Sequence, residues 1–462
     1  MRILIQADGA LPGHGEEAAW LAEEVRYLLA RQGAVRLAHP DGPHDPAAAA
    51  SLHTLSLEIP ASASGRAVRL TLNAPDGALL EHASLGPKPD TRLGLIEQIA
   101  ERLGAVAARN VDAGSLVPLI GTSDTALYDE YTRTHVAHLR AIRLASTGPA
   151  AAEPAARRLE RFERMTRRDP RFARAWSALA LAYLELRGRD EDALAKLADG
   201  AATRALELDP QLPEAQAALG RTRYRYGQWL EAEDRLIAAL AVDPAAPTAL
   251  EAYACFLLDL GRIGYAQQVA AQALGTVPGS DDARECLALA ELAAGDIAAA
   301  RTTLGVATAA APAGLARARA LVELAGEDEA AALAALAAAT PRPRQAAGAL
   351  EPVLKALDTS GSRAGALRAL TRAVDQRYVD AATETLLGTA LEQPDFVFNR
   401  LVRMRSQRQA VPLRLLWLPG SRYLREHPRF AEVIDQLGLQ TYWSQRGRPD
   451  HCRSEPAVAG CV

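Results

Sequence analysis

A 34-residue repeat in the middle of the chain limits the fold more than any other feature of the sequence. Glycine recurs at Gly227, Gly261 and Gly295, each 34 residues after the last. Alanine and proline recur at the same interval, in the series Ala232, Ala266, Ala300, then Ala239, Ala273, Ala307, then Pro244, Pro278, Pro312. A glycine permits the turn after a first helix, small residues allow two helices to approach closely, and proline cannot continue a second helix. The period therefore predicts a stack of helix–turn–helix units.

The helical repeats are predicted to fill residues 120–345. An earlier repeat opens with Trp176, Leu179, Ala180 and Tyr183 and closes at Pro210. It is longer than the others by about six residues, which we place near 187–191. The helix pair before it is expected over 122–144 and 155–168. The clearest repeats are expected at 173–212, 213–246, 247–280 and 281–314, followed by degenerate helical repeats and a C-terminal cap over 346–452 and a tail over 453–462.

Residues 1–112 have a different pattern, which mixes strands with helices. Short apolar or alternating segments at 3–7, 35–37, 52–59 and 68–72 predict strands, and Asp76-Gly77 predicts a tight hairpin before Leu79. Apolar residues at helical spacing predict helices over 16–31 and 93–108. We therefore expect a small α/β N-terminal domain followed by an all-α superhelical solenoid.

Composition and charge exclude several classes of protein. The net charge is −4 over 462 residues, which argues against a globally basic nucleic-acid binder. Charged residues interrupt the apolar stretches, so we expect no membrane span. The chain starts with too short an apolar run for a signal peptide, and we expect a cytoplasmic protein.

The four cysteines are too few for a disulfide scaffold in a chain of this length. Cys255 and Cys286 fall within helical patterns and are interpreted as buried thiols. Cys452 and Cys461 lie in the tail, where a disulfide is an alternative to free thiols.

The repeat motifs resemble those of tetratricopeptide repeat (TPR) proteins, and residues 1–112 resemble the TolB amino-terminal-like domain that often precedes such repeats. The C-terminal sequence around Leu424–Phe430 and Tyr442-Trp443 is similar to the end of bacterial proteins with this layout. Those proteins are often transcription regulators or adenylate-cyclase-like proteins. Their winged-helix or cyclase domain comes first, whereas this chain opens on the α/β unit. The resemblance therefore implies interaction and puts DNA binding and cyclase activity in doubt.

In TPR proteins the first helices of the repeats line a concave groove that binds a partner segment. Of the family's groove positions in this sequence, the cluster of Arg221, Tyr224 and Arg225 is the strongest candidate for an acidic segment or a peptide carboxylate. The acidic groove positions Glu251, Asp259, Asp282 and Glu285 favour a basic or mixed partner segment instead. A solvated helix face is the competing interpretation. The candidate groove residues are Arg174, Glu185, Arg221, Tyr224, Arg225, Glu251, Asp259, Asp282 and Glu285.

An arginine stripe is a second candidate surface. Its members recur three or four residues apart and so share one helical face. They can meet phosphate or an acidic partner. A solvated face, partly neutralised by Glu160, Glu163 and Asp169, is the interpretation we favour. The stripe consists of Arg157, Arg161, Arg164, Arg168 and Arg171.

No motif predicts catalysis, a cofactor or a metal. The loop from Gly9 to Gly15 lies between a strand and a helix, but it lacks a phosphate-binding motif. His135 and His138 share a helix face, with no further ligand at metal spacing. We therefore expect a non-enzymatic scaffold in bacterial signalling or regulation. Its partner would be a protein or peptide segment, or a second copy of the chain. The alternative is a ligand-sensing regulator whose α/β domain acts on a transcription or cyclase module.

Overall fold

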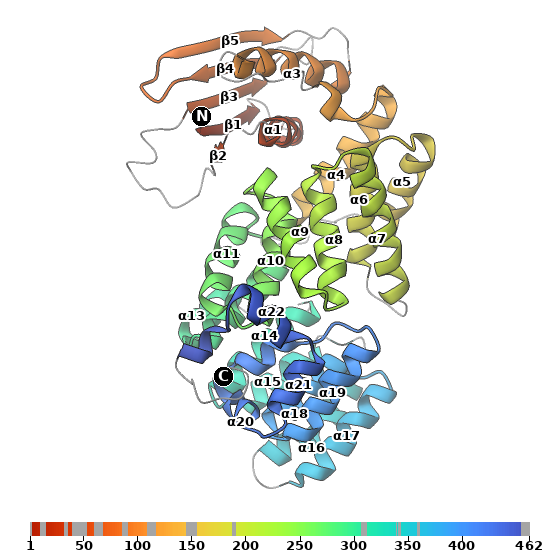
Figure 1. Ribbon diagram of the computed structural model, residues 1–462, viewed down its shortest axis with the longest axis vertical. Coiled ribbons are helices and arrows are strands. Elements are labelled where there is room, and N and C mark those ends of the chain that lie inside the picture. The colour runs from red at the N-terminus through yellow and green to blue at the C-terminus, as the bar shows by residue number, and fades with distance from the viewer. Residues whose placement is uncertain are drawn as a thin grey trace. The chain divides into compact units, whose positions relative to one another are not determined.

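The computed structural model describes most of the chain in two compact units. The described residues are 2–9, 15–31, 36–38, 53–59, 68–85, 91–108, 117–144, 155–186, 191–305, 312–338, 340, 343–357 and 361–453. The first unit contains Met1–Thr222, Arg235–Ala249 and Gly275–Gly279. The second contains Arg223–Asp234, Leu250–Leu274 and Ser280–Val462. Figure 1 labels the helices and strands of the chain.

The first unit begins with a five-stranded mixed sheet in the order β2-β1-β3-β4-β5. The strand β1 is parallel to β2 and β3, and β4 is antiparallel to β3 and β5. Leu55 pairs with Leu72 and Leu57 with Leu70, which puts these four leucines on one face. The strands are β1 (Arg2–Gly9), β2 (Arg36–Ala38), β3 (His53–Ile59), β4 (Val68–Asn73) and β5 (Leu79–Leu85).

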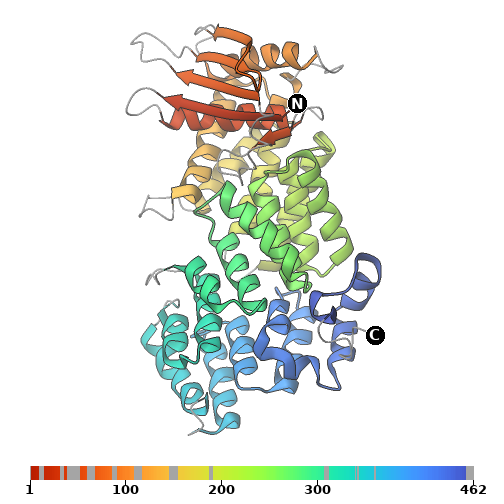
Figure 2. The same ribbon diagram turned by 90° about the vertical axis from the view of Figure 1, so that its left-hand side faces the viewer.

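Two helices, α1 (Gly15–Ala30) and α3 (Arg92–Ala108), pack on each other and against the sheet (Figures 1 and 2). The leucines of β3 and β4 are at most 1% exposed, because alternate strand residues point to the helix-covered face. The turn before β5 is the predicted one, with Gly77 at φ +84°. The described elements of residues 1–112 therefore follow the order that the sequence predicted.

Four helices continue the first unit: α4 (Thr125–Leu144), α5 (Ala155–Arg168), α6 (Ala173–Glu185) and α7 (Glu191–Leu208), with the short 3₁₀ helix η1 (Val117–Ile120) before them. One hydrophobic core extends from Trp20 in α1 through Tyr128 in α4 to Leu219. The expected boundary near residue 112 therefore does not separate two cores. The insertion predicted near residues 187–191 falls largely outside the described residues.

The next three helix pairs keep the 34-residue period. The first helices begin 34 residues apart, at Pro213, Pro247 and Asp281, and the second helices begin at Trp229, Ile263 and Ile297. Gly227, Gly261 and Gly295 all have positive φ in the turns between them. This is a TPR-like helical repeat fold. The pairs are α8 (Pro213–Arg225) with α9 (Trp229–Val242), α10 (Pro247–Asp259) with α11 (Ile263–Thr276), and α12 (Asp281–Ala293) with α13 (Ile297–Leu304).

Helices continue through the described part of the second unit as far as Arg453. The helices predicted at 346–357, 362–376 and 380–391 are present, and α19 follows them. They are α14 (Ala313–Ala325), α15 (Glu329–Ala338), α16 (Pro343–Leu357), α17 (Arg363–Asp375), α18 (Ala381–Ala390) and α19 (Pro394–Ser406). A C-terminal region of short helices then begins: η2 (Leu413–Trp417), η3 (Pro419–Ser421), α20 (Arg422–Arg425), α21 (Phe430–Gln436), α22 (Leu439–Arg446) and η4 (Asp450–Arg453).

Candidate partner-binding site

The second unit brings three of the predicted groove residues together around one arginine. Tyr224 lies at the end of α8, Asp259 ends α10, and Glu285 lies in α12. These are the first helices of three consecutive repeats, and the residues converge on Arg414 of η2. We call Tyr224, Asp259 and Glu285, which together hold Arg414, the arginine clamp.

The clamp holds Arg414 through both its side chain and its backbone. Arg414 Nε donates to Asp259 Oδ1 over 2.8 Å, and Arg414 Nη2 donates to Asp259 Oδ2 over 3.2 Å. Arg414 Nη1 donates to Glu285 Oε1 over 3.0 Å, and the Arg414 backbone N–H donates to Asp259 Oδ1 over 2.8 Å. Tyr224 Oη donates to the same Asp259 carboxylate. Two carboxylates on neighbouring repeats thus share one guanidinium, whose planar fork suits such bonding.

Burial makes these charges depend on one another. The Asp259 side chain is 1% exposed and that of Arg414 is 16% exposed. Burial lowers the pKa of Arg414, but the Asp259 carboxylate outweighs it and the pKa lies well above the ordinary value. Burial raises the pKa of Glu285, and Arg414 offsets this only in part. Asp259 is therefore the main counter-ion, and removing Arg414 would leave a buried carboxylate unpaired.

The segment that carries Arg414 is fixed on both sides of the clamp. Leu413, Leu415 and Leu416 are at most 2% exposed. Trp417 Nε1 donates to the Asp259 carbonyl over 2.8 Å, and Trp443 Nε1 donates to the Leu260 carbonyl over 3.1 Å. The chain's own C-terminal region therefore occupies the clamp.

Tyr442 and Trp443 of the C-terminal region pack on a repeat far from them in the sequence. Tyr442 contacts Phe256 of α10, with ring centroids 5.7 Å apart. Trp443 bonds the residue that follows α10. Both side chains are at most 4% exposed. They cap the repeat that contains α10, and the sequence pattern gives no sign of this return of the chain.

The cysteine prediction was wrong, because Cys255 and Cys286 form a disulfide bond. The two residues are 31 positions apart, three short of the repeat period. In the repeat register, Cys286 corresponds to a position one helical turn before Cys255. Neighbouring first helices can bring such positions together, and the bond joins α10 to α12 beside the clamp. Arg414 Nη1 lies 3.8 Å from Cys286 Sγ.

Two other predicted groove residues form ion pairs within the first unit. Arg174 is 5% exposed and forms a bidentate ion pair with Glu24 of α1. Glu185 forms an ion pair with Arg158 of α5. Both were assigned from repeat position alone, which does not reveal distant partners.

The remaining groove candidates are less enclosed. Arg221, Arg225 and Glu251 are half-buried, and Asp282 at the start of α12 is exposed. Arg221 belongs to the first unit, whereas the other three belong to the second. The predicted cluster of Arg221, Tyr224 and Arg225 is thus divided between units, and Tyr224 serves the clamp.

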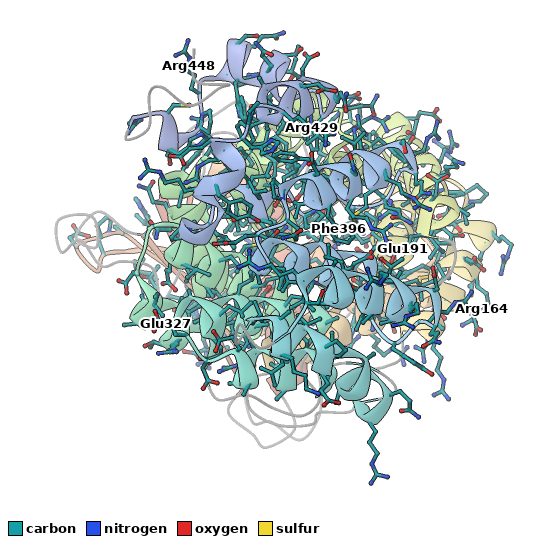
Figure 3. The ribbon with its side chains drawn as sticks, turned by 90° about the horizontal axis from the view of Figure 1, so that it is seen from below. Arg164, Glu191, Glu327, Phe396, Arg429 and Arg448 are labelled. Atoms are coloured by element: carbon teal, nitrogen blue, oxygen red, sulfur yellow. A yellow bond between two sulfur atoms is a disulfide. The ribbon has the colours of Figure 1, made fainter. Side chains whose placement is uncertain are left out.

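The arginine stripe lies on α5 and its neighbouring loop. Arg164 pairs with Glu130 over 3.2 Å and Arg168 pairs with Asp124 over 2.7 Å, so two of its charges are balanced by α4 and the residue before it. Arg157 and Arg171 are exposed, and Arg161 is half-buried. Arg164 points outward in Figure 3. These contacts fit a partly neutralised solvated face, and the acids that pair with Arg164 and Arg168 come from α4 and the residue before it.

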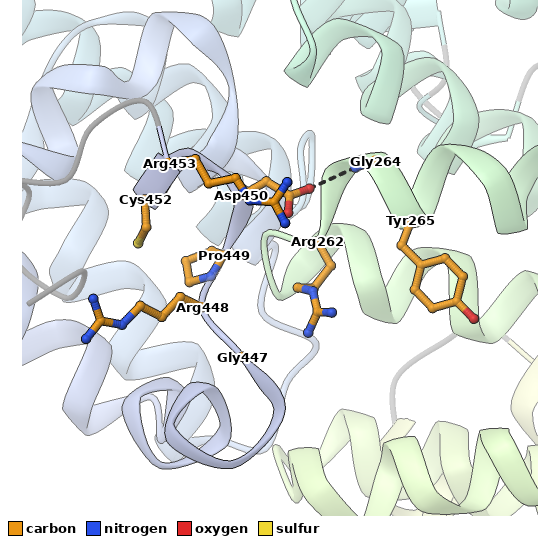
Figure 4. A pocket seen from close by; sticks show the side chains of 9 residues that line it. All are labelled: Arg262, Gly264, Tyr265, Gly447, Arg448, Pro449, Asp450, Cys452 and Arg453. Carbon is orange, nitrogen blue, oxygen red and sulfur yellow. Dashed lines mark hydrogen bonds between the residues drawn. The ribbon is translucent and has the colours of Figure 1, made fainter.

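A cavity of about 670 Å³ lies between the start of α11 and the C-terminal end of the described chain (Figure 4). Arg262, Arg448 and Arg453 line it. Asp450 Oδ2 accepts from the Gly264 N–H over 2.9 Å, which caps α11. Figure 4 shows the Arg262 and Arg448 side chains pointing in different directions, so they do not form one anion cradle.

Several weaker predictions lie outside the described residues. Residues 10–14 of the Gly9–Gly15 loop are among them, as are Cys461 and the side chain of His138. Among the described residues, no group of three or more His, Cys, Asp or Glu side chains is arranged to hold a metal. None of the described helices is long and apolar enough to cross a membrane.

No protein-family model matches the chain. No curated protein matches it either. Among solved structures, the crystal structure of TTC0263, a thermophilic TPR protein in Thermus thermophilus, is 25% identical over 42% of this chain and 99% of that one, with a TM-score of 0.27. A structure of Naa15/Naa10 bound to HypK-THB is 14% identical over 71% of this chain and 53% of that one, with a TM-score of 0.23. The TPR-like assignment rests on the 34-residue register of the helices.

Proposed function

We propose that the chain is a non-catalytic protein-interaction scaffold whose repeats capture a short segment that carries an arginine. The arginine clamp supports this proposal. Asp259 and Glu285 sit at groove positions of consecutive repeats, and together they hold the guanidinium of Arg414. The chain's own segment is then the resident occupant, and a partner segment with the same chemistry would use the same carboxylates.

Such a partner would have to compete with the chain's own Arg414 segment for the two carboxylates. A segment tethered within the chain has an effective concentration of about millimolar or higher. A free peptide of the same sequence must exceed that concentration or meet a groove whose own arginine has left. Partner binding is therefore expected to be weak in the resting protein and strong when Arg414 is absent.

The test uses the Arg414→Ala variant and a fluorescein-labelled peptide of residues 411–418. We expect the variant to bind this peptide at least about tenfold more tightly than the wild type does, because the tethered competitor is gone. A peptide with alanine in place of its arginine should lose this gain. Arg422→Ala is the matched control, since Arg422 is 66% exposed and pairs with Glu426 at the end of its own short helix. Fluorescence anisotropy gives the dissociation constants.

Loss of Arg414 leaves Asp259 without its counter-ion and can weaken the fold. N-ethylguanidinium at millimolar concentration supplies the missing group, and it should raise the melting temperature of Arg414→Ala but not of Arg422→Ala. A folded Arg414→Ala protein that binds the arginine and alanine peptides equally would refute the proposal.

We also propose a cellular role and a compartment for the chain. The TPR-like repeats, together with the resemblance of residues 1–112 to the TolB amino-terminal-like domain, suggest a role in bacterial signalling or regulation. A cytoplasmic location remains our preferred compartment. The alternative, a ligand-sensing α/β domain, stays a prediction, because residues 10–14 of the Gly9–Gly15 loop lie outside the described residues.

A further inference from the structure

We infer that the Cys255–Cys286 disulfide is a thiol–disulfide exchange site that controls the arginine clamp, with a dithiol as its reaction partner. The inference rests on the proposed function, because the disulfide would regulate the same groove. It starts from where the bond lies. The bond links α10 to α12, which are the first helices of two repeats and carry the two clamp carboxylates.

The disulfide and the two clamp carboxylates lie on the same two helices, α10 and α12. Asp259 lies four residues after Cys255, one turn along the same face of α10. Glu285 is the neighbour of Cys286 in α12, and Arg414 Nη1 contacts both Glu285 Oε1 at 3.0 Å and Cys286 Sγ at 3.8 Å. The bond therefore fixes the separation of two carboxylates that must reach one guanidinium. Breaking it frees α10 and α12 to move apart.

The two cysteine residues differ in exposure. Cys286 is fully buried, at 0% exposure, whereas Cys255 is partly exposed. An attacking thiolate can therefore reach Cys255 Sγ and not Cys286 Sγ. The sulfur of Cys286 becomes the leaving group, and it lies beside a guanidinium. A cation stabilises a thiolate, and a leaving thiolate with a lowered pKa departs faster.

The exchange balances in two steps. A thiolate of the dithiol attacks Cys255 Sγ and forms a mixed disulfide, while the electron pair of the S–S bond leaves on Cys286 Sγ. The second sulfur of the dithiol then attacks the mixed disulfide at the dithiol's own sulfur and expels the Cys255 thiolate. The dithiol is oxidised to a disulfide, and its two protons end on Cys255 and Cys286.

The cytoplasmic location that we propose favours a regulatory role for this disulfide. In a reducing cytoplasm, disulfides are usually transient and serve catalysis or redox sensing, whereas structural disulfides belong to oxidising compartments. A disulfide next to the clamp of a cytoplasmic scaffold would close the groove under oxidation and open it under reduction.

Two measurements on the whole chain test the inference. An excess of 2-mercaptoethanol, a monothiol, is expected to form an adduct that maps to Cys255 by mass spectrometry. Reduction by dithiothreitol without denaturant is then expected to speed hydrogen exchange at the Arg414 amide by about tenfold, because that amide donates to Asp259 and reports clamp closure directly. An adduct at Cys286, or a bond that resists dithiothreitol in the folded protein, would overturn the inference.

Controls separate this inference from the proposed function. Cys255→Ser/Cys286→Ser should reproduce the fast exchange and the tighter peptide binding without any reductant. Cys452 also takes part in a disulfide, so Cys452→Ser is the control for loss of a different bond. This variant should respond to dithiothreitol as the wild type does. If Arg414→Ala binds the 411–418 peptide but reduction changes neither exchange nor affinity, the scaffold proposal survives and the redox inference fails. If reduction speeds exchange but no form binds the peptide, the scaffold proposal fails.

Discussion

Arg174 and Glu24, which are 150 positions apart in the sequence, form a buried bidentate ion pair in the first unit. Arg174 Nη1 donates to Glu24 Oε2 over 2.8 Å, and Arg174 Nη2 donates to Glu24 Oε1 over 2.6 Å. The Arg174 guanidinium also lies over the Tyr27 ring, 4.1 Å from its centroid, and Tyr128 Oη donates to Glu24. This contact joins α1 of the α/β domain to α6, the first helix of the earliest clear repeat.

Two further arginines, one in α1 and one directly after it, meet the repeats in the same way. Arg31 bonds Asp209 with both terminal nitrogens, and Arg26 pairs with Asp243. Asp209 and Asp243 both precede a proline and are 34 residues apart, so they occupy equivalent places in consecutive repeats. The α1 region thus forms ion pairs with equivalent aspartates in two consecutive repeats.

The first prediction concerns removal of the buried pair. Arg174→Ala leaves the Glu24 carboxylate buried and unpaired, which should cost about 3–5 kcal/mol of unfolding free energy. The double variant Arg174→Met/Glu24→Gln should cost less than Arg174→Ala alone, because no charge is left behind. Urea denaturation measures both. Arg164→Ala, which breaks the exposed pair with Glu130, should change stability by less than about 1 kcal/mol.

The second prediction concerns pH. Burial opposes ionisation of Glu24, but Arg174 and the hydrogen bonds from Arg174 and Tyr128 outweigh it, so the pKa lies below the ordinary value of 4.5. A carboxyl with a lowered pKa stabilises the fold fully above its unfolded pKa, and this stabilisation is lost as the pH falls through the folded pKa. The stability gap between wild type and Glu24→Gln should therefore be constant near neutral pH and shrink below about pH 4.5. A gap that grows on acidification would contradict the pairing.

The sequence predicted the local structure well because periodicity is a local signal. The strands over 53–59 and 68–73 follow alternation, and the repeat helices follow from Gly227, Gly261 and Gly295, which turn the chain at positive φ. Candidate groove residues could also be assigned, because the repeat fixes which positions share a helix face.

The partners of those residues were not predictable. The repeat pattern does not pair Arg174 with Glu24 or Asp259 with Arg414. In each pair one residue lies outside the repeats, Glu24 before them and Arg414 after them. The disulfide was missed for a related reason. Two cysteines 31 residues apart do not share a repeat position, and their contact depends on how neighbouring first helices are offset. Arg414 itself carries no motif, and its role emerges only from the path of the chain.

The third prediction concerns the contribution of the disulfide to stability. The bond closes a loop of 31 residues, for which the loop-entropy model gives about 3–4 kcal/mol. Cys255→Ser/Cys286→Ser should lower the unfolding free energy of the second unit by about that amount, measured by urea denaturation without reductant. Wild type and variant should match once both are reduced with dithiothreitol. If the oxidised wild type and the variant unfold at the same urea concentration, the bond contributes no net stability.

The fourth prediction compares two glycines at equivalent repeat positions. Gly261 and Gly295 have φ of +78° and +90°, so alanine at either position should cost about 1–2 kcal/mol from backbone strain. Their surroundings differ. A β-carbon at Gly261 would lie 2.6 Å from Pro449 Cβ and 3.4 Å from the Trp417 ring, whereas one at Gly295 would meet nothing within 4 Å.

Gly261→Ala should therefore cost about 1–3 kcal/mol more than Gly295→Ala, because the cap formed by Trp417 and Pro449 must shift. The two variants share the backbone penalty, so the difference between their urea midpoints isolates the contact with the cap. The same shift should reach the clamp, since Trp417 Nε1 bonds the Asp259 carbonyl. Faster hydrogen exchange at the Arg414 amide is expected in Gly261→Ala and not in Gly295→Ala. Equal destabilisation and equal exchange in the two variants would mean that Trp417 and Pro449 do not contact the turn at Gly261.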